Sequence, residues 1–183
     1  MEEAEIESRQ LTKEEIRRGK VSREEFRKLK RNPIYLVLDG LKCAHNVGTI
    51  IRLSDALLVG KVYLCGDTVL PLTRKVRKGS LGSEKWVDWE HREDALDTVS
   101  ELKNKGVSII TAEIATASID YRYVDYPLPA CLVLGREDRG VSKDIIALSD
   151  IVVHLPLYGM VNSLNVSTVA AVLMYQMAEK LNN

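Results

Sequence analysis

The chain has 183 residues, of which 26 are basic and 26 acidic, and 45% are hydrophobic, which excludes a largely disordered protein and suits one globular domain with a sizeable core. No uncharged apolar run reaches the roughly 18 residues of a membrane span, and the acidic start MEEAEIESRQ lacks the apolar centre of a secretory signal. Three widely spaced cysteines form no CxxC pair, so we expect neither a disulfide framework nor a zinc site. We therefore expect the protein in a reducing cytoplasm.

The first thirty residues contain two copies of one unit, TKEEIRRG (12–19) and SREEFRKL (22–29). Each copy begins with a hydroxyl residue and has glutamate three positions later, which is the spacing of a capping box. Gly19 suits the end of the first helix. We therefore predict two short helices, followed by a break at Asn32-Pro33.

Basic residues are concentrated in two stretches although the total charge is zero. Residues 9–31 carry ten basic residues against four glutamates, and residues 74–85 carry five against one. Local basic clusters of this kind suit the binding of phosphates. The other interpretation is a solvated helix face.

From residue 34 onward, strands are expected to alternate with helices. Strands are predicted at 34–39, 61–65, 86–91, 107–113, 130–135 and 150–157, and helices at 47–59, 94–106 and 165–181. This order predicts an α/β fold with a mostly parallel sheet flanked by helices. Ligand sites in such sheets lie at the carboxyl ends of the strands. We expect two domains, a basic helical extension at 1–32 and the α/β domain at 33–183.

The last predicted helix is apolar on more than one face, since residues 169–175 read VAAVLMY. A surface helix needs only one apolar stripe. Two interpretations remain open, namely packing against a partner subunit and burial as the central helix of a monomer.

Several common sites are missing from the sequence. No G-x-G, no GK[ST] phosphate loop and no HExxH occurs, which disfavours a small-molecule nucleotide-binding protein. His45, His91 and His154 are isolated from one another and are interpreted as structural.

The segment HNVGTIIR (45–52) is the first of three that follow predicted strands. Asn46 can cap the following helix, and Gly48 allows another chain to approach its first turn. Arg52 has two interpretations. It either pairs with Asp55 at helical i,i+3 spacing, or directs its guanidinium at a phosphate or hydroxyl near the strand ends.

The second segment is LVLGREDRGVS (132–142), a buried strand that runs into Gly135 and a charged turn closed by Gly140. It is either an ordinary strand–helix loop or a place where a ligand lies against exposed backbone. The third is HLPLYGMVNSLNVS (154–167), in which Ser163 is a candidate N-cap of the last helix. A helix N-terminus is also a site for a carboxylate ligand.

Together, in this order and spacing, the three segments resemble the signature motifs of the SpoU/TrmH family of RNA 2′-O-ribose methyltransferases, which belong to the SPOUT class. The matching residues are Asn46, Gly48 and Arg52 in the first motif, Gly135, Glu137 and Gly140 in the second, and Pro156, Gly159, Ser163, Leu164, Asn165, Val166 and Ser167 in the third. The resemblance covers about residues 33–181, and residues 77–87 also resemble a family segment. The second motif usually reads like GSEGRG, whereas this chain has GREDRG.

The resemblance implies a SPOUT fold with a C-terminal trefoil knot and a cleft for S-adenosylmethionine. The residues expected around this cofactor are Thr111, Ala112, Leu134, Gly135, Leu155, Pro156, Met160 and Leu164. Arg52 is expected to contact the ribose hydroxyl or its neighbouring phosphate. The other residues expected to shape the catalytic site are Asn46, Glu137, Ser163 and Asn165. The reaction requires no metal.

The resemblance also implies a homodimer that acts on structured RNA. The residues expected to track the RNA backbone are Arg17, Arg18, Arg27, Lys28, Arg74, Lys75, Arg77 and Lys78. tRNA is favoured over rRNA because only two short helices precede the catalytic domain. The alternatives are an rRNA 2′-O-methyltransferase, a SPOUT enzyme that methylates a base nitrogen, and a non-catalytic RNA-binding protein of the same fold.

Overall fold

The computed structural model describes residues 9–182, and the chain divides into two units, 1–30 and 31–183. The first unit contains the helices α1 (Lys13–Arg18) and α2 (Arg23–Lys28). Both capping boxes form, and Gly19 caps the end of α1, as the sequence predicts. Residues 1–8 of the predicted N-terminal domain lie outside the described residues, and its boundary at residue 32 stays a prediction.

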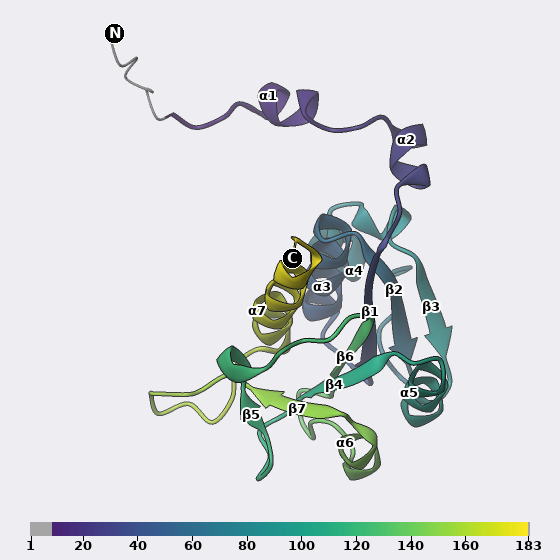
Figure 1. The fold of residues 1–183 in the computed structure, drawn as a ribbon. Helices are drawn as coiled ribbons and strands as arrows, with labels where there is room; N and C mark the ends of the chain where they lie inside the picture. The colour runs from purple at the N-terminus through teal and green to yellow at the C-terminus, as the bar shows by residue number, and fades with distance from the viewer. Residues whose placement is uncertain (1–8, 183) are drawn as a thin grey trace, which may run out of the picture. The chain divides into compact units, whose positions relative to one another are not determined.

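The second unit is built on a seven-stranded sheet in the order β3-β2-β1-β6-β4-β7-β5 (Figure 1). The strands are β1 (Asn32–Asp39), β2 (Val59–Cys65), β3 (Trp89–Arg92), β4 (Ser108–Ala112), β5 (Ile119–Asp120), β6 (Ala130–Leu134) and β7 (Ile151–His154). All neighbouring strands of this sheet run parallel. The predicted parallel α/β sheet is therefore confirmed, while the trefoil knot stays a prediction.

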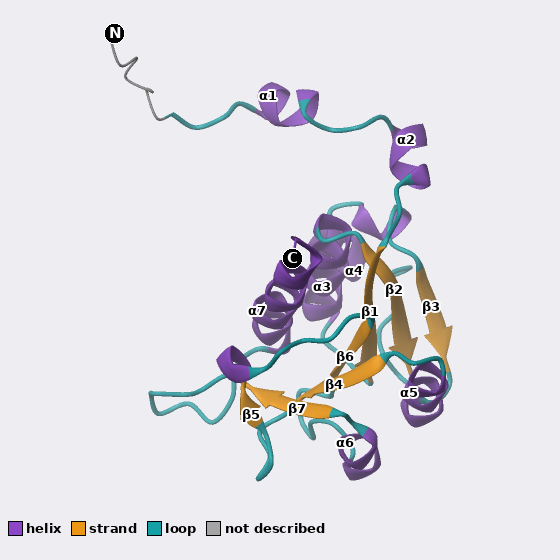
Figure 2. Ribbon diagram, viewed as in Figure 1, coloured by secondary structure: helices purple, strands orange, loops and turns teal. Residues whose placement is uncertain are grey.

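Helices cover both faces of the sheet (Figure 2). They are α3 (Ala44–Ala56), α4 (Arg74–Ser80), α5 (Ala95–Asn104), α6 (Lys143–Leu148) and α7 (Val166–Glu179), with short 3-10 turns η1 (Ser83–Lys85), η2 (Tyr121–Tyr123) and η3 (Lys180–Asn182). Side chains of α3, α4 and α7 belong to one hydrophobic core, and those of α5 and α6 belong to another. Within residues 9–182, no helix is long and apolar enough to cross a membrane.

The central strands are apolar throughout because each strand sends alternate side chains into the two cores. In β1, Leu36 and Leu38 lie in the core beneath α3 and α7, whereas Val37 lies in the core beneath α5. In β6, Leu132 lies in the first of these cores and Val133 in the second. The continuous apolar runs in the sequence thus correspond to buried parallel strands.

Helices α3 and α4 meet backbone to backbone at Gly48 and Gly79. A Cβ atom on Gly48 would lie 2.6 Å from the carbonyl oxygen of Val76 and 2.9 Å from the Cα of Gly79. The predicted close approach of another segment at Gly48 is therefore confirmed. This packing fixes α4 against the N-terminal half of α3.

Some element bounds differ from the predictions. The strand β1 begins at Asn32, whose side-chain amide donates to the Leu57 carbonyl at 2.7 Å, and its pairing with β2 is irregular between Asn32 and Tyr35, at the predicted break. The predicted helix at 47–59 begins at Ala44 and ends at Ala56. The short elements α4, α6 and β5 were not predicted. The two helices have only seven and six residues and the strand only two, which is too short to show a hydrophobic period.

Candidate active site

A cleft of about 430 Å³ opens at the carboxyl ends of β4, β6 and β7. Its volume is within the range of pockets that bind small molecules. Its wall combines apolar side chains such as Leu134, Leu155 and Val169 with the carboxylates of Glu113, Glu137 and Asp138. The last two of the three sequence motifs therefore converge on one cavity.

Three polar side chains join all three motifs in one hydrogen-bonded chain. Asn165 donates its Nδ2 to the Oδ1 of Asn46 at 3.0 Å, and Asn46 donates its own Nδ2 to Glu137 at 3.0 Å. Asn46 is 3% exposed, whereas Glu137 and Asn165 are exposed, so the chain runs from a buried amide to the protein surface. The motif residues are far apart in the sequence, and this chain holds them at one place.

The capping predictions for these residues are wrong. Asn46 does not cap α3, because the helix begins earlier and its N-cap is Cys43. Ser163 does not cap α7 either, since the N-cap is Asn165, whose Oδ1 accepts from the Ser167 backbone N–H at 2.8 Å. Asn165 therefore stabilises the helix start with its oxygen and holds Asn46 with its nitrogen.

Glu137 lies opposite the N-terminus of α3. Its carboxylate accepts from the backbone N–H groups of Lys42 and Cys43, both at 3.4 Å, in addition to Asn46. Partial burial acts to raise the pKa of Glu137, but the hydrogen bonds from its own backbone, Asn46, Lys42 and Cys43 outweigh it, and the net pKa is lowered. Glu137 is therefore held as a carboxylate at neutral pH.

The second motif folds tightly because two glycines face each other. A Cβ atom on Gly135 would collide with the backbone of Gly140 and Val141. Gly140 adopts a positive φ of 68°, and a Cβ there would collide with the Glu113 carboxylate. Glu113 in turn accepts from the Val141 backbone N–H at 2.9 Å. The tight turn that lines the cleft therefore requires glycine at both positions.

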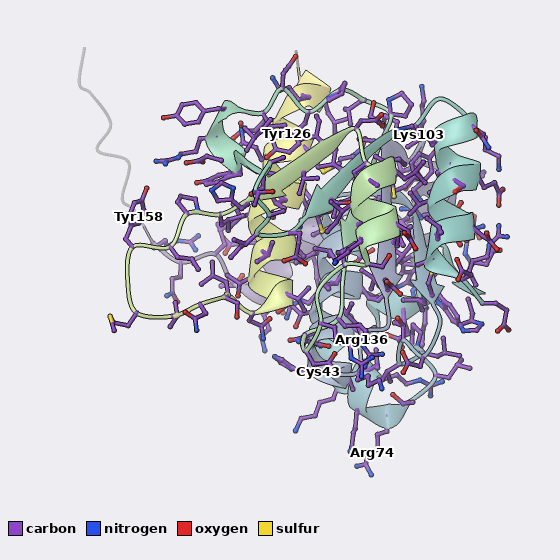
Figure 3. The ribbon with its side chains drawn as sticks, turned by 90° about the horizontal axis from the view of Figure 1, so that it is seen from below. Cys43, Arg74, Lys103, Tyr126, Arg136 and Tyr158 are labelled. Atoms are coloured by element: carbon purple, nitrogen blue, oxygen red, sulfur yellow. The ribbon has the colours of Figure 1, made fainter. Side chains whose placement is uncertain are left out.

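Most of the residues predicted for cofactor binding line the cleft, namely Ala112, Leu134, Gly135, Leu155 and Leu164. Thr111, Pro156 and Met160 do not. Thr111 is fully buried and its hydroxyl bonds to Ser149 at 2.6 Å, because strand alternation turns it away from the cavity. Met160 is 99% exposed, on the same loop as Tyr158, which projects from the body in Figure 3.

Arg52 lies outside the cleft lining of its own chain. It is exposed on α3, six residues after Asn46. Because each helical residue adds about 100° of rotation, Arg52 lies on a different face of the helix from Asn46. The alternative pairing with Asp55 does not form, since Asp55 accepts from the Ser83 hydroxyl at 3.1 Å. Within residues 9–182, the Arg52 guanidinium makes no hydrogen bond or ion pair. The catalytic role of Arg52 stays a prediction.

The residues predicted to bind RNA are all exposed. Arg17 and Arg18 lie in the last turn of α1, and Arg27 and Lys28 in the last turn of α2. The other four lie on α4, whose Val76 is buried while its basic side chains reach solvent, as Arg74 does in Figure 3.

Sequence reasoning missed Glu113 and His154, which both line the cleft. Glu113 directly follows β4, so the position of a strand end was the available signal. The Nδ1 of His154 contacts the Ser118 hydroxyl at 2.9 Å. In the part of the chain that the structure describes, no cluster of His, Cys, Asp or Glu is placed to hold a metal ion.

Comparison with known families gives a match over residues 33–175 to the model of the SpoU rRNA Methylase family. The chain belongs to this family. The match covers the whole sheet except the first residue of β1, and α7 as far as residue 175. The resemblance read from the three motifs is therefore confirmed.

The chain is similar to two curated tRNA (guanosine(18)-2′-O)-methyltransferases. It is 35% identical to that of Aquifex aeolicus over 148 residues, which are 80% of this chain and 69% of the relative. It is 33% identical to that of Escherichia coli over 141 residues, which are 76% of this chain and 60% of the relative. The match thus spans about two thirds of the length of these relatives.

The crystal structure of the A. aeolicus TrmH/SpoU tRNA modifying enzyme superposes on the chain with a TM-score of 0.77 at 31% identity. The superposition covers 87% of this chain and 82% of that one. The fold class implied by the motifs is confirmed by this likeness.

Proposed function

We propose that this SpoU-family protein transfers a methyl group from S-adenosylmethionine to a ribose 2′-hydroxyl of structured RNA, most readily tRNA. The observation that carries the proposal is the hydrogen-bonded chain of Asn165, Asn46 and Glu137, which brings the three family motifs to the edge of one cleft. The similar A. aeolicus and E. coli proteins are both named tRNA 2′-O-methyltransferases, which favours tRNA over rRNA. We propose the cytoplasm as the place of action.

The residues of the cleft fit S-adenosylmethionine. Apolar side chains such as Leu134 and Leu155 line the cleft and suit an adenine ring. The carboxylates of Glu113 and Glu137 suit the positive charge of a sulfonium and an amino group, whereas that of Asp138 is paired with Arg136. The cofactor supplies an activated methyl group.

The chain's own residues then have to align the ribose and remove a proton from its hydroxyl. Asn46 and Asn165 fix the Glu137 carboxylate near the cleft, at the N-terminus of α3. Arg52 carries a positive charge that no residue of 9–182 pairs with, and this charge suits the phosphate beside the target hydroxyl. Arginine is protonated throughout the usual pH range, so positioning of the phosphate is its proposed role, with the proton lost to another acceptor.

A homodimer explains how Arg52 would reach a cleft, because Arg52 lies outside the cleft of its own chain. We propose that Arg52 of one protomer acts at the cleft of its partner. Exposed apolar side chains support such an interface, since Tyr175 on α7 is 55% exposed and Leu164 at the cleft rim is 40% exposed.

RNA affinity is assigned to the basic side chains of α1, α2 and α4. They are exposed and clustered, as side chains that contact phosphates must be. They supply affinity without sequence choice, so binding should weaken as the salt concentration rises.

Transfer assays with S-adenosylmethionine carrying a labelled methyl group test the proposal. We expect label in unmodified tRNA, and much less in ribosomal RNA. Arg52→Ala should lower the transfer rate by at least about a hundredfold while calorimetry shows unchanged cofactor binding. Retention of RNA on a filter with no cofactor heat and no transfer would instead identify a non-catalytic RNA-binding protein. Stronger labelling of rRNA than of tRNA would overturn the assignment of tRNA as the substrate.

A further inference from the structure

Four charged side chains gather at the carboxyl ends of three adjacent strands. Lys42 follows β1, Asp67 follows β2, and Arg136 and Asp138 follow β6. We call these four residues the ionic clamp. Figure 3 shows Arg136 at this end of the sheet, beside Cys43 at the start of α3.

Arg136 is the centre of the clamp, and its guanidinium binds two carboxylates. Nε and Nη2 donate to the two oxygens of Asp138 at 3.0 and 3.2 Å, and Nη1 donates to both oxygens of Asp67 at 3.4 Å. Lys42 approaches Asp67 from the other side, with its Nζ 2.8 Å from Oδ2. The clamp therefore ties the three segments that follow β1, β2 and β6.

The same segments hold Glu137. Glu137 lies between Arg136 and Asp138 in the sequence, and it accepts from the backbone N–H of Lys42. Gly40, with a φ of 67°, lets the segment after β1 pass close to Arg136, since a Cβ there would lie 2.9 Å from Cγ of Arg136. A shift of either segment would therefore move the carboxylate relative to Asn46.

The two departures from the usual GSEGRG motif, Arg136 and Asp138, are hydrogen-bond partners of each other. Both carboxylates that Arg136 contacts have lowered pKa values, that of Asp138 chiefly through Arg136 and that of Asp67 chiefly through Lys42. Both carboxylates are thus ionised at neutral pH. Asp67 and Asp138 are more than half exposed, so the clamp adds little to global stability.

We propose that the ionic clamp is a positioning device for the active site: through Arg136 and Lys42, Asp67 fixes Glu137 against Asn46. Asp67 does not line the cleft, so it acts only through other residues. The kinetic part of this inference rests on the proposed function.

Asp67→Asn is the test variant, because it removes one charge from the clamp and leaves every cleft residue in place. We expect kcat for RNA methylation to fall about tenfold while the KM for RNA changes less than about twofold. Asp67→Glu, which keeps the charge, should recover most of the rate. Glu101→Gln is the matched control, since it removes an exposed carboxylate that pairs with Lys105 and Arg92 and with none of the clamp residues, and its rate should equal the parental one.

A double variant separates positioning from a general structural effect. In a Glu137→Gln background, Asp67→Asn should lower kcat by less than about twofold further, because its effect passes through Glu137. Parental kcat in Asp67→Asn, or fully additive losses in the double variant, would overturn the inference.

An NMR measurement is independent of catalysis. The side-chain NH₂ signals of Asn46 should shift and broaden in Asp67→Asn and remain parental in Glu101→Gln. If the parental protein methylates no RNA, the proposed function fails and these signals alone decide the inference. Unchanged Asn46 signals in Asp67→Asn would overturn it.

Discussion

Asn46 is the residue on which the geometry of the candidate site depends most. It is buried, and its amide uses both ends, with the nitrogen donating to Glu137 and the oxygen accepting from Asn165. A side-chain amide can donate from its nitrogen and accept at its oxygen without carrying charge. A buried polar group left without its hydrogen-bond partners costs free energy, so substitution of Asn46 should lower the free energy of unfolding.

Asn46→Asp tests this arrangement through its pH dependence. The new carboxylate would lie at the position from which Asn46 donates to Glu137, so we expect two like charges to repel and the shared folded-state pKa to rise above the unfolded values. A raised folded-state pKa means that the folded variant holds a proton more tightly than the unfolded variant does. The loss in its free energy of unfolding, relative to the parental protein, therefore becomes smaller as the pH falls. Urea unfolding should show a loss of about 1–3 kcal/mol near pH 8 and a smaller loss near pH 5.

Asn46→Ala is the control for this titration, because it removes the same hydrogen bonds without adding a charge. Its deficit should vary less with pH. A deficit for Asn46→Asp that is equal at both pH values would contradict close contact between positions 46 and 137.

At the scale of elements, the packing of α4 on α3 presents the basic side chains that we assign to RNA. Gly48 and Gly79 allow the two backbones to touch, and Val76 anchors α4 in the core. Arg74 and its basic neighbours on α4 therefore project from a fixed helix, and not from a free loop.

Gly48→Ala should force these helices apart, since a Cβ would lie 2.6 Å from a backbone carbonyl that cannot rotate away. We expect a loss of about 1–3 kcal/mol in the free energy of unfolding, measured in urea, together with weaker RNA binding. Gly19→Ala is the matched control, because a Cβ there would meet only one atom, at 3.9 Å, and its stability should stay parental. A stable Gly48→Ala variant would show that the close approach is unimportant.

The elements also show what the sequence could and could not predict. Long apolar runs such as residues 130–135 predicted buried strands, because strands covered on both faces need no polar alternation. The repeated hydroxyl–glutamate spacing predicted α1 and α2 because the capping signal is local. The N-caps of α3 and α7 were misplaced by three and two residues, since Asn46 and Asn165 make tertiary hydrogen bonds that local spacing does not contain. Glu113 and the ionic clamp were missed for the same reason.

At the scale of the whole molecule, the position of Arg52 is the feature that a single chain does not explain. It is exposed, outside the cleft, and the partner predicted for it, Asp55, is bonded elsewhere. A second protomer that brings Arg52 to the partner cleft resolves this difficulty and gives the exposed Tyr175 a partner surface.

Mixing two inactive variants tests the proposed sharing between protomers. Arg52→Ala and Asn165→Ala should each methylate RNA poorly alone. After co-refolding, mixed dimers contain one cleft with an intact Asn165 and an intact Arg52 from the other chain, so about a quarter of the parental activity should return. If mixed dimers are demonstrated by mass but no methylation activity returns, either Arg52 acts at the cleft of its own protomer or it has no role in methyl transfer.

The atom of the nucleotide that receives the methyl group distinguishes ribose methylation from base methylation. Mass spectrometry of nucleosides from unmodified tRNA, after incubation with the protein and S-adenosylmethionine, determines this directly. We predict a single new nucleoside whose added 14 Da remains on the ribose after the base is released, and which resists alkaline cleavage at the adjoining bond. A mass increase on the base would contradict ribose methylation, and no increase with folded, cofactor-bound protein would contradict the catalytic assignment.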